Sequence, residues 1–122
     1  MAEWEIEFPG EFEEWWNNLS QNEKIDVDAK VRLLQEFGPA LGRPHVGVIK
    51  TSRHPNMKEL RVQHAGRPYR VVFAFDPRRS AILLIGGDKT GDKRWYGNFV
   101  PIADRLFDQH LEQLKKEGHS RG

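Results

Sequence analysis

The 122-residue sequence contains no cysteine, which excludes disulfide frameworks, thiol nucleophiles and thiolate metal sites together. It also lacks any apolar run that approaches the roughly 18 residues of a membrane span. Residues 1–8 carry three glutamates and no long apolar stretch, so no secretory signal is predicted. Thirteen aromatic residues are too many for a disordered chain. We therefore expect a soluble, cytoplasmic protein that forms one domain over residues 1–122.

Motifs for metals and common cofactors are missing as well. No two histidines lie three or four residues apart in the set His45, His54, His64, His110 and His119. The sequence has no nucleophile elbow and no Rossmann or Walker pattern. Residues 86–91, Gly-Gly-Asp-Lys-Thr-Gly, lack the spacing of a phosphate-binding loop and are predicted to form a turn. No metal and no cofactor are expected.

Charge of each sign is concentrated in a different part of the chain. Residues 1–37 hold ten acidic and three basic residues, a net charge of −7, whereas residues 43–94 hold twelve basic and four acidic residues, a net charge of +8. Solvated surface charge is the ordinary explanation of such residues. A three-to-one excess over fifty residues nevertheless favours a polyanionic partner for the basic part.

The first forty residues predict one strand and two helices. Alternation of apolar and acidic residues over 4–8 predicts a strand, which Pro9-Gly10 ends. Apolar residues at helical spacing predict a helix over 11–19. Residues 20–37 begin with the capping box Ser-Gln-Asn-Glu, which favours a helix, although strict alternation over 25–33 also fits a strand. We predict a helix that Gly38-Pro39 stops.

The middle of the chain predicts a three-stranded antiparallel meander. Residues 38–56 are expected to be mostly loop, with a short extended piece at 46–50. Strands are predicted over 58–64, 69–75 and 80–85. Pairing His64 with Tyr69 and Phe75 with Ser80 places an apolar set on one face: Leu60, Val62, Val71, Phe73, Ile82 and Leu84.

The opposite face of this meander would gather the polar residues. It receives Glu59, Arg61 and Gln63 from the first strand and Arg70 from the second, with Ala81, Leu83 and Ile85 from the third. The chain would close with an amphipathic helix over 101–116 that begins at Pro101.

Charged side chains on that face suit phosphodiester chemistry without a metal. Glu59, Arg61 and Arg70 would be joined from the next loop by Lys89, Lys93, Arg94 and Tyr96. Guanidinium groups bind phosphate oxygens and stabilise charge that builds on phosphorus. A carboxylate can take the proton of a ribose 2′-hydroxyl, and tyrosine or lysine can assist the leaving 5′-oxygen. The alternative is a solvated face whose charges pair with their neighbours.

Several segments in this order resemble the RelE/HigB toxin superfamily, and most of all its HigB-type, phage-related branch. The resemblance is carried by Leu-Gly-Arg-Pro at 41–44, Met-Lys-Glu-Leu-Arg-Val at 57–62 and Tyr-Arg-Val-Val-Phe-Ala-Phe-Asp at 69–76. Gly-Gly-Asp-Lys-Thr at 86–90 and Ile-Ala-Asp-Arg-Leu at 102–106 extend it over nearly the whole chain. It implies a small α+β fold, RelE-like: an N-terminal strand, two helices, an antiparallel β-meander and a C-terminal helix.

The resemblance also implies an activity, namely ribosome-dependent cleavage of mRNA as a type II toxin that inhibits translation. Arg70 matches the arginine that steadies the scissile phosphate, and Arg61 matches a basic position on the same face. Lys89 falls where a basic residue, often arginine, lies near the leaving group. Tyr96 falls near the tyrosine that stacks on or orients the base. Some members carry two lysines where this chain has Lys58 and Glu59, and the strand parity makes Glu59 the hypothetical general base.

The implied partners are mRNA on the ribosome and a cognate antitoxin, expected to be a helix-turn-helix protein. Phosphate contacts are expected from Lys50, Arg53, Lys58, Lys93 and Arg94, while Trp95 could either pack or stack on a base. The acidic first part of the chain would lie away from ribosomal RNA or hold a basic antitoxin segment. The alternative function is a non-catalytic module of this fold that binds nucleic acid or a partner protein.

Overall fold

The computed structural model describes residues 3–118 as an α+β fold built on one five-stranded sheet. Its elements in chain order are β1 (Ile6–Glu7), α1 (Gly10–Asn17), α2 (Gln21–Phe37), the 3-10 helix η1 (Gly38–Ala40), β2 (Val46–Val48), β3 (Lys58–His64), β4 (Arg67–Phe75), β5 (Ala81–Asp88) and α3 (Trp95–Lys116). The strand order is β1-β5-β4-β3-β2, with β1 parallel to β5 and the other pairs antiparallel. The α+β class and the expected succession of elements are confirmed.

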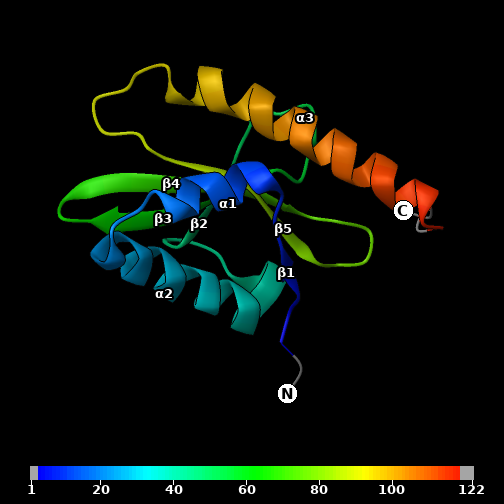
Figure 1. Cartoon of the computed structure of the whole chain (residues 1–122), viewed down its shortest axis with the longest axis horizontal. Coiled ribbons are helices and arrows are strands. Elements are labelled where there is room, and N and C mark those ends of the chain that lie inside the picture. Colours follow the sequence, from blue (N-terminus) through cyan, green and yellow to red (C-terminus); the bar gives the residue numbers. More distant parts are fainter. Residues whose placement is uncertain (1–2, 119–122) are drawn as a thin grey trace.

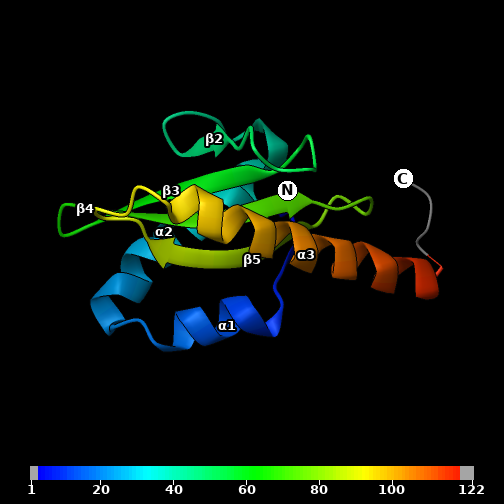
Figure 2. The same cartoon turned by 90° about the horizontal axis from the view of Figure 1, so that it is seen from above.

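Helices cover both faces of the sheet. In Figure 1, α2 and α3 lie on opposite sides of the strands, and Figure 2 shows the same layers from above. One core lies between the sheet and the helices α1 and α2, and it includes Phe12, Leu34, Leu60 and Phe73. A second core lies between the sheet and α3. We call the two faces of the sheet the α2 face and the α3 face.

Residues 20–37 form the predicted helix rather than a strand. Both hydrogen bonds of the capping box are present: the Glu23 amide donates to the Ser20 hydroxyl at 3.2 Å, and the Ser20 amide donates to the Glu23 carboxylate at 2.7 Å. Val27 and Leu34, two turns apart, are buried against the sheet. The local alternation of apolar residues therefore gives way to a capped helix that buries one face.

The register between β3 and β4 differs from the prediction by two residues. His64 pairs with Arg67 instead of Tyr69, because the hairpin closes through the two residues Ala65 and Gly66. Both have positive φ, 50° and 77°, as a type I′ turn requires. A shift of two keeps every side chain on its predicted face. Leu60 and Val62 accordingly lie on the α2 face, and Glu59 and Arg61 on the α3 face.

The register between β4 and β5 was predicted with the wrong parity. Phe75 pairs with Ala81 rather than Ser80, so Ala81 and Leu83 lie on the α2 face while Ile82 and Leu84 pack under α3. A bulge opposite Val72 and Phe73 then shifts the register once more. Every residue from 81 to 85 is apolar, and helices cover both faces of the sheet. The sequence pattern of β5 therefore fits either of two pairing registers with β4 that differ by one residue.

Two boundaries near the end of the sheet also differ from the prediction. Gly86, Gly87 and Asp88 belong to β5 instead of a turn, and α3 begins at Trp95 rather than at Pro101, which lies inside the helix. A Cβ at Gly87 would lie 2.8 Å from the Trp95 ring nitrogen, so this glycine allows the first turn of α3 to pack directly on the strand. Residues 95–100 therefore form the first part of α3.

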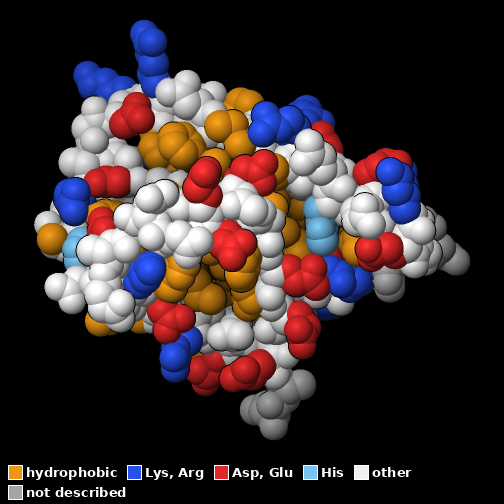
Figure 3. Space-filling model, in the orientation of Figure 1, with side chains coloured by type: hydrophobic (Ala, Val, Ile, Leu, Met, Phe, Trp, Pro, Cys, Tyr) orange, Lys and Arg blue, Asp and Glu red, His pale blue; other side chains and the backbone are white. Residues whose placement is uncertain are grey.

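The acidic first part of the chain gathers negative charge on one face of the molecule. In Figure 3, acidic side chains gather around the middle and lower part of the face formed by α1 and α2, and basic side chains lie nearer its margins. None of the helices within residues 3–118 combines the length and apolar character that crossing a bilayer requires.

Candidate functional site

Four polar side chains meet on the α3 face of the sheet, beside the first turn of α3. Arg61 of β3 and Arg70 of β4 are directly paired, and Glu59 lies two residues before Arg61 on the same face. The first turn of α3 adds Tyr96. We call Glu59, Arg61, Arg70 and Tyr96 the arginine–tyrosine cluster. The parity of two strands therefore brings together the residues that the sequence predicted for this face.

Glu59 lies at the centre of the cluster and its side chain is only 5% exposed. The Tyr96 hydroxyl donates to one carboxylate oxygen at 2.7 Å, and Arg61 Nε donates to the other at 3.2 Å. Arg70 Nε forms an ion pair with Glu59 at 3.5 Å, which is too long for a good hydrogen bond. A buried carboxylate that accepts two hydrogen bonds and forms an ion pair orients the groups around it.

The Tyr96 phenol is held in its protonated form. Burial raises the pKa of Tyr96, and the hydrogen bond to Glu59 raises it further, against a smaller opposite effect of Arg70. Lys89 lies over the ring, with its Nζ 5.7 Å from the ring centroid. The Tyr96 phenol is therefore a hydrogen-bond donor within the cluster, and Lys89 lies against its ring.

Arg70 is the least satisfied member of the cluster. Its Nη1 donates to the carbonyl oxygen of Tyr69 at 3.1 Å, but its buried Nε has no hydrogen-bond partner in the described chain. Arg61 is more open, with a side chain 37% exposed. Arg61 is thus the more accessible guanidinium group of the pair, and Arg70 keeps one buried donor without an acceptor.

Gly47 of β2 makes room for Arg61, a role that sequence reasoning missed. Gly47 pairs with Glu59, and a Cβ at Gly47 would lie 2.4 Å from Arg61 Nη2 and 2.8 Å from Cζ. The guanidinium group therefore lies across the backbone of β2. An isolated glycine between Val46 and Val48 was the available signal, because glycine inside a strand often marks close approach of another group.

Basic side chains continue from Arg61 along the edge of the sheet. A groove of about 660 Å³ between η1 and β2 is lined by Arg43, Lys50, Lys58 and Arg61 and by no acidic residue. We call it the basic groove. Lys50 and Lys58 were predicted phosphate contacts, whereas Arg43 was not singled out. Lys93 and Arg94 are exposed in the loop before α3.

Two predicted RNA contacts are placed differently. Trp95 is 1% exposed, and its ring stacks on Phe99 with centroids 4.5 Å apart, so it packs in the core and offers no surface to a base. Arg53 lies beside α3, where it forms an ion pair with Asp108 at 2.5 Å. The Arg53 side chain is still 63% exposed, so its contact with RNA stays a prediction.

Two of the histidines, His54 and His64, are engaged by carboxylates outside the cluster. His54 Nε2 lies 2.8 Å from Asp108, and His64 Nδ1 lies 2.7 Å from Asp26 of α2. Neither carboxylate belongs to the arginine–tyrosine cluster. His119 lies outside the described residues. Within residues 3–118 no three His, Asp or Glu side chains are grouped as metal ligands would be.

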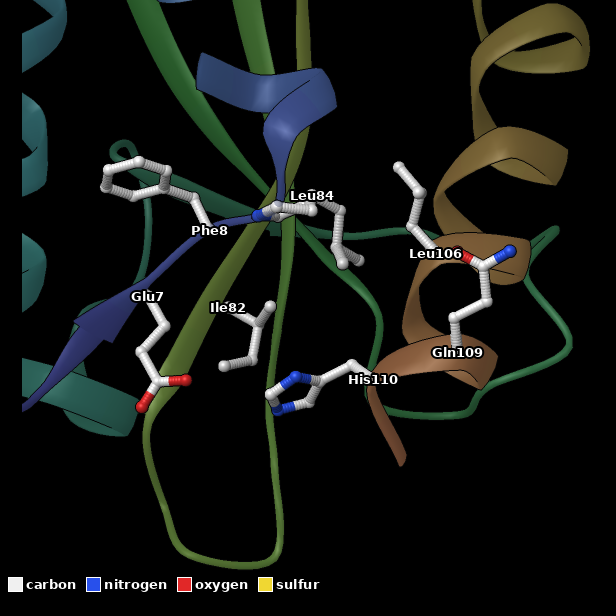
Figure 4. A pocket seen from close by; sticks show the side chains of 8 residues that line it. Glu7, Phe8, Ile82, Leu84, Leu106, Gln109 and His110 are labelled. Atoms are coloured by element: carbon white, nitrogen blue, oxygen red, sulfur yellow. The ribbon is translucent and has the colours of Figure 1, made fainter. Parts of the chain in front are cut away.

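A separate hollow lies between β1, β5 and α3 and has a volume of about 210 Å³. Figure 4 shows Ile82, Leu84 and Leu106 on its walls, with Glu7 and His110 near the mouth. His110 is held by the buried Asp76 at 2.8 Å. None of the residues of the arginine–tyrosine cluster lines this hollow.

Comparisons with known proteins match this chain to one phage-derived family and to proteins named as toxins. Residues 14–108, which include the whole cluster, match the family described as "Phage derived protein Gp49-like (DUF891)". The chain is 49% identical over 100 residues to a Mycobacterium tuberculosis protein named "Putative toxin HigB3", which covers 81% of this chain and 86% of that protein.

A second protein of the same organism, named "Putative toxin HigB2", is 45% identical over 103 residues. The match covers 83% of this chain but 51% of that protein, so the chain spans about half the length of this relative.

Proposed function

The chain belongs to the phage-derived Gp49-like family and is a HigB-type toxin of a toxin–antitoxin system, and on this premise we propose that it is a ribosome-dependent endoribonuclease. It would cleave mRNA without a metal and thereby inhibit translation, until a cognate antitoxin neutralises it. The observation that carries the proposal is the arginine–tyrosine cluster, in which two guanidinium groups and a phenol surround one buried carboxylate.

The charge of the cluster suits a phosphodiester substrate. Within the cluster, Arg61 and Arg70 supply two positive charges against the single negative charge of Glu59, and Lys89 adds a third beside Tyr96. In the cleavage reaction the ribose 2′-hydroxyl loses its proton to solvent water as its oxygen attacks phosphorus. A 2′,3′-cyclic phosphate forms while the 5′-oxygen leaves, and negative charge builds on the phosphate oxygens during this step. Fixed guanidinium groups stabilise that charge more than they stabilise the starting diester. Arg61 and Arg70 are proposed to bind the scissile phosphate in this way.

The proton for the leaving 5′-oxygen is proposed to come from Tyr96 or Lys89. The raised pKa of Tyr96 keeps its phenol protonated at neutral pH, so that it can donate a proton. Lys89 lies against the ring of Tyr96, so either group can approach the same oxygen.

Glu59 is proposed to position the cluster instead of acting as the general base. Its carboxylate oxygens face Tyr96, Arg61 and Arg70, and its side chain is almost inaccessible to a ribose hydroxyl. Loss of the carboxylate would leave two directly opposed guanidinium groups to repel each other. The role of Glu59 is therefore to hold the donors in place.

The basic groove is proposed as the path of the RNA backbone towards the cluster. Arg43, Lys50 and Lys58 extend the positive surface from Arg61 along β2. Lys93 and Arg94 provide further exposed charge on the loop that leads into α3. Such contacts bind phosphate without reading sequence, so RNA affinity should fall steeply with salt.

The test is transcript mapping by primer extension after induction of the wild-type chain, of Arg70→Ala and of Arg105→Ala. Arg105 is an exposed arginine of α3 outside the cluster and serves as the matched control. We expect discrete cuts within translated regions for the wild type and Arg105→Ala and none for Arg70→Ala. Intact transcripts and normal growth from folded wild-type protein would overturn the nuclease and favour a non-catalytic binding module.

A further inference from the structure

An apolar groove opens between α1 and α2, on the α2 side of the sheet. We call it the α1–α2 groove. It has a volume of about 350 Å³, and its apolar walls are formed by Ile6, Phe8, Phe12, Trp16, Val31 and Leu83. Figure 3 looks onto this face and shows a hollow of hydrophobic side chains below the acidic residues in the middle of the view. The volume lies within the range of about 300–1,000 Å³ that is usual for sites enclosing a bound group.

The depth of the α1–α2 groove distinguishes it from scattered surface apolar residues. Phe12 and Leu83 are buried core residues that form its floor. Phe8 stands at the mouth, 50% exposed, with its ring 5.6 Å from that of Phe12. An aromatic ring half in water beside a hollow that reaches the core is typical of a surface that a partner covers.

The rim of the groove is acidic. Glu13 of α1 and Asp28 of α2 line it, and α1 carries two further glutamates, Glu11 and Glu14, with no basic residue in its last turn. The nearest cations are already engaged: Arg32 is paired with Asp28 at 2.7 Å, and Lys24 lies over the ring of Trp16.

Glu13 forms no salt bridge within the described part of the chain, so its charge is available to a partner. A cationic segment would gain from this rim, whereas the phosphate backbone of RNA would be repelled by it.

We propose that the α1–α2 groove is the docking site for a basic amphipathic segment of the cognate antitoxin. Apolar side chains of the segment fill the hollow between Phe8, Trp16 and Val31, and a Lys or Arg side chain of the segment lies against Glu13. The inference rests on the proposed function, because it takes the antitoxin as the partner. The charge of the rim and the apolar floor together select a cationic protein segment over a nucleic acid.

The groove and the arginine–tyrosine cluster lie on opposite faces of the sheet. A substitution at the groove therefore leaves Arg61, Arg70 and Tyr96 untouched. Groove variants are expected to keep the cleavage activity of the wild type while losing sensitivity to the antitoxin. Antitoxin binding and mRNA cleavage can therefore be measured independently in each variant.

The test compares Phe8→Ser and Glu13→Lys with the control Glu14→Lys. Glu14 is an exposed residue of the same helix that does not line the groove, and its change alters the net charge as Glu13→Lys does. The probe is the purified product of the reading frame that adjoins the gene for this chain, titrated calorimetrically into each full-length variant at one salt concentration. We expect Kd to rise about tenfold or more for Phe8→Ser and Glu13→Lys and by less than about threefold for Glu14→Lys.

Wild-type affinity of both groove variants, each checked for folding by circular dichroism, would overturn the docking site and leave the proposed nuclease intact. Absence of binding to the wild-type chain would overturn the site together with its partner, while transcript mapping still decides the nuclease. A wild-type chain that is dimeric by light scattering, with Phe8→Ser monomeric, would assign the groove to a second copy and also overturn the proposal.

Discussion

The carboxylate of Glu59 joins side chains from three elements, although it is almost removed from water. Its two oxygens accept hydrogen bonds from Tyr96 of α3 and Arg61 of β3, and Arg70 of β4 lies beside them. A buried charge is stable only when such partners satisfy it, and the partners are in turn fixed by it. A substitution of Glu59 can therefore test whether this residue positions the arginines or takes part in the reaction itself.

Glu59→Gln should lower the rate of mRNA cleavage about 10- to 100-fold, because the neutral amide no longer holds two opposed guanidinium groups. RNA affinity should not fall, since a negative charge has been removed from a phosphate-binding surface. Single-turnover cleavage and equilibrium RNA binding at fixed salt measure the two effects. Glu36→Gln, at an exposed position on α2, is the matched control. An unchanged cleavage rate in Glu59→Gln would contradict the positioning role.

Gly47→Ala should impair cleavage nearly as much as Arg61→Ala does. The new Cβ would lie 2.4 Å from Arg61 Nη2, so the guanidinium group must move away from Glu59. A flexible side chain moves at little cost, and we expect the free energy of unfolding to change by less than about 1 kcal/mol.

Urea unfolding and cleavage assays of Gly47→Ala test this expectation together. Gly42→Ala is the control, because a Cβ at Gly42 would meet nothing within 4 Å. Normal cleavage by Gly47→Ala would show that the placement of Arg61 over β2 is not needed.

At the scale of elements, the β3–β4 hairpin sets the parity of the whole cluster. Its two-residue turn places Ala65 at φ 50°, a left-handed conformation that costs alanine more than it costs glycine or asparagine. The pairing of Arg61 with Arg70 depends on this turn, because hairpin length determines register.

Ala65→Asn should stabilise the protein by about 0.5–1 kcal/mol, since Asn-Gly is preferred in type I′ turns. Ala65→Val should destabilise it, because a β-branched side chain tolerates positive φ poorly. Midpoints of urea unfolding for the two variants and the wild type measure the difference. Equal midpoints for all three would mean that the turn does not limit stability.

At the scale of the whole molecule, carboxylates tie distant elements together. Burial alone would raise the pKa of Asp76, but hydrogen bonds from His110 and Arg78 outweigh it, and the pKa is lowered. The hydrogen bond from Arg53 lowers the pKa of Asp108. These two residues connect β4, the loop after β2, and α3. They also make the stability of the fold depend on pH.

Stability should be nearly constant from pH 7 to about 5 and should fall below that, because carboxyl groups in the unfolded chain have pKa values of about 3.9–4.3. A lowered folded-state pKa contributes stability above the unfolded pKa, and that contribution is lost as the pH falls through the folded pKa. Urea unfolding at pH 7, 5, 4 and 3 measures the decline. Asp76→Asn should be less stable than the wild type at pH 7, and its stability should fall less between pH 5 and pH 3. An identical fall in both proteins would show that Asp76 does not contribute to the pH dependence.

Much of the site could be predicted from the sequence because β3 and β4 have unlike faces. Leu60 and Val62 alternate with Glu59 and Arg61, so a register error of two residues left the cluster on its correct face. Strand β5 offers no such contrast, since both of its faces are apolar, and its parity was wrong. The burial of Trp95 could not be predicted from the sequence either. An aromatic residue in a basic segment can pack in the core or lie on the surface, and only its neighbours in the fold decide between the two.

The sequence by itself determined the family, the α+β class, the capped helix α2 and the side of the sheet on which Glu59, Arg61 and Arg70 lie, because these depend on local periodicity and short motifs. Only the tertiary structure decided that α3 starts at Trp95, that Tyr96 reaches Glu59 and that Gly47 clears space for Arg61. Those contacts join segments far apart in the chain. Their energy comes from packing and burial, which act only once the sheet and the helix are in place.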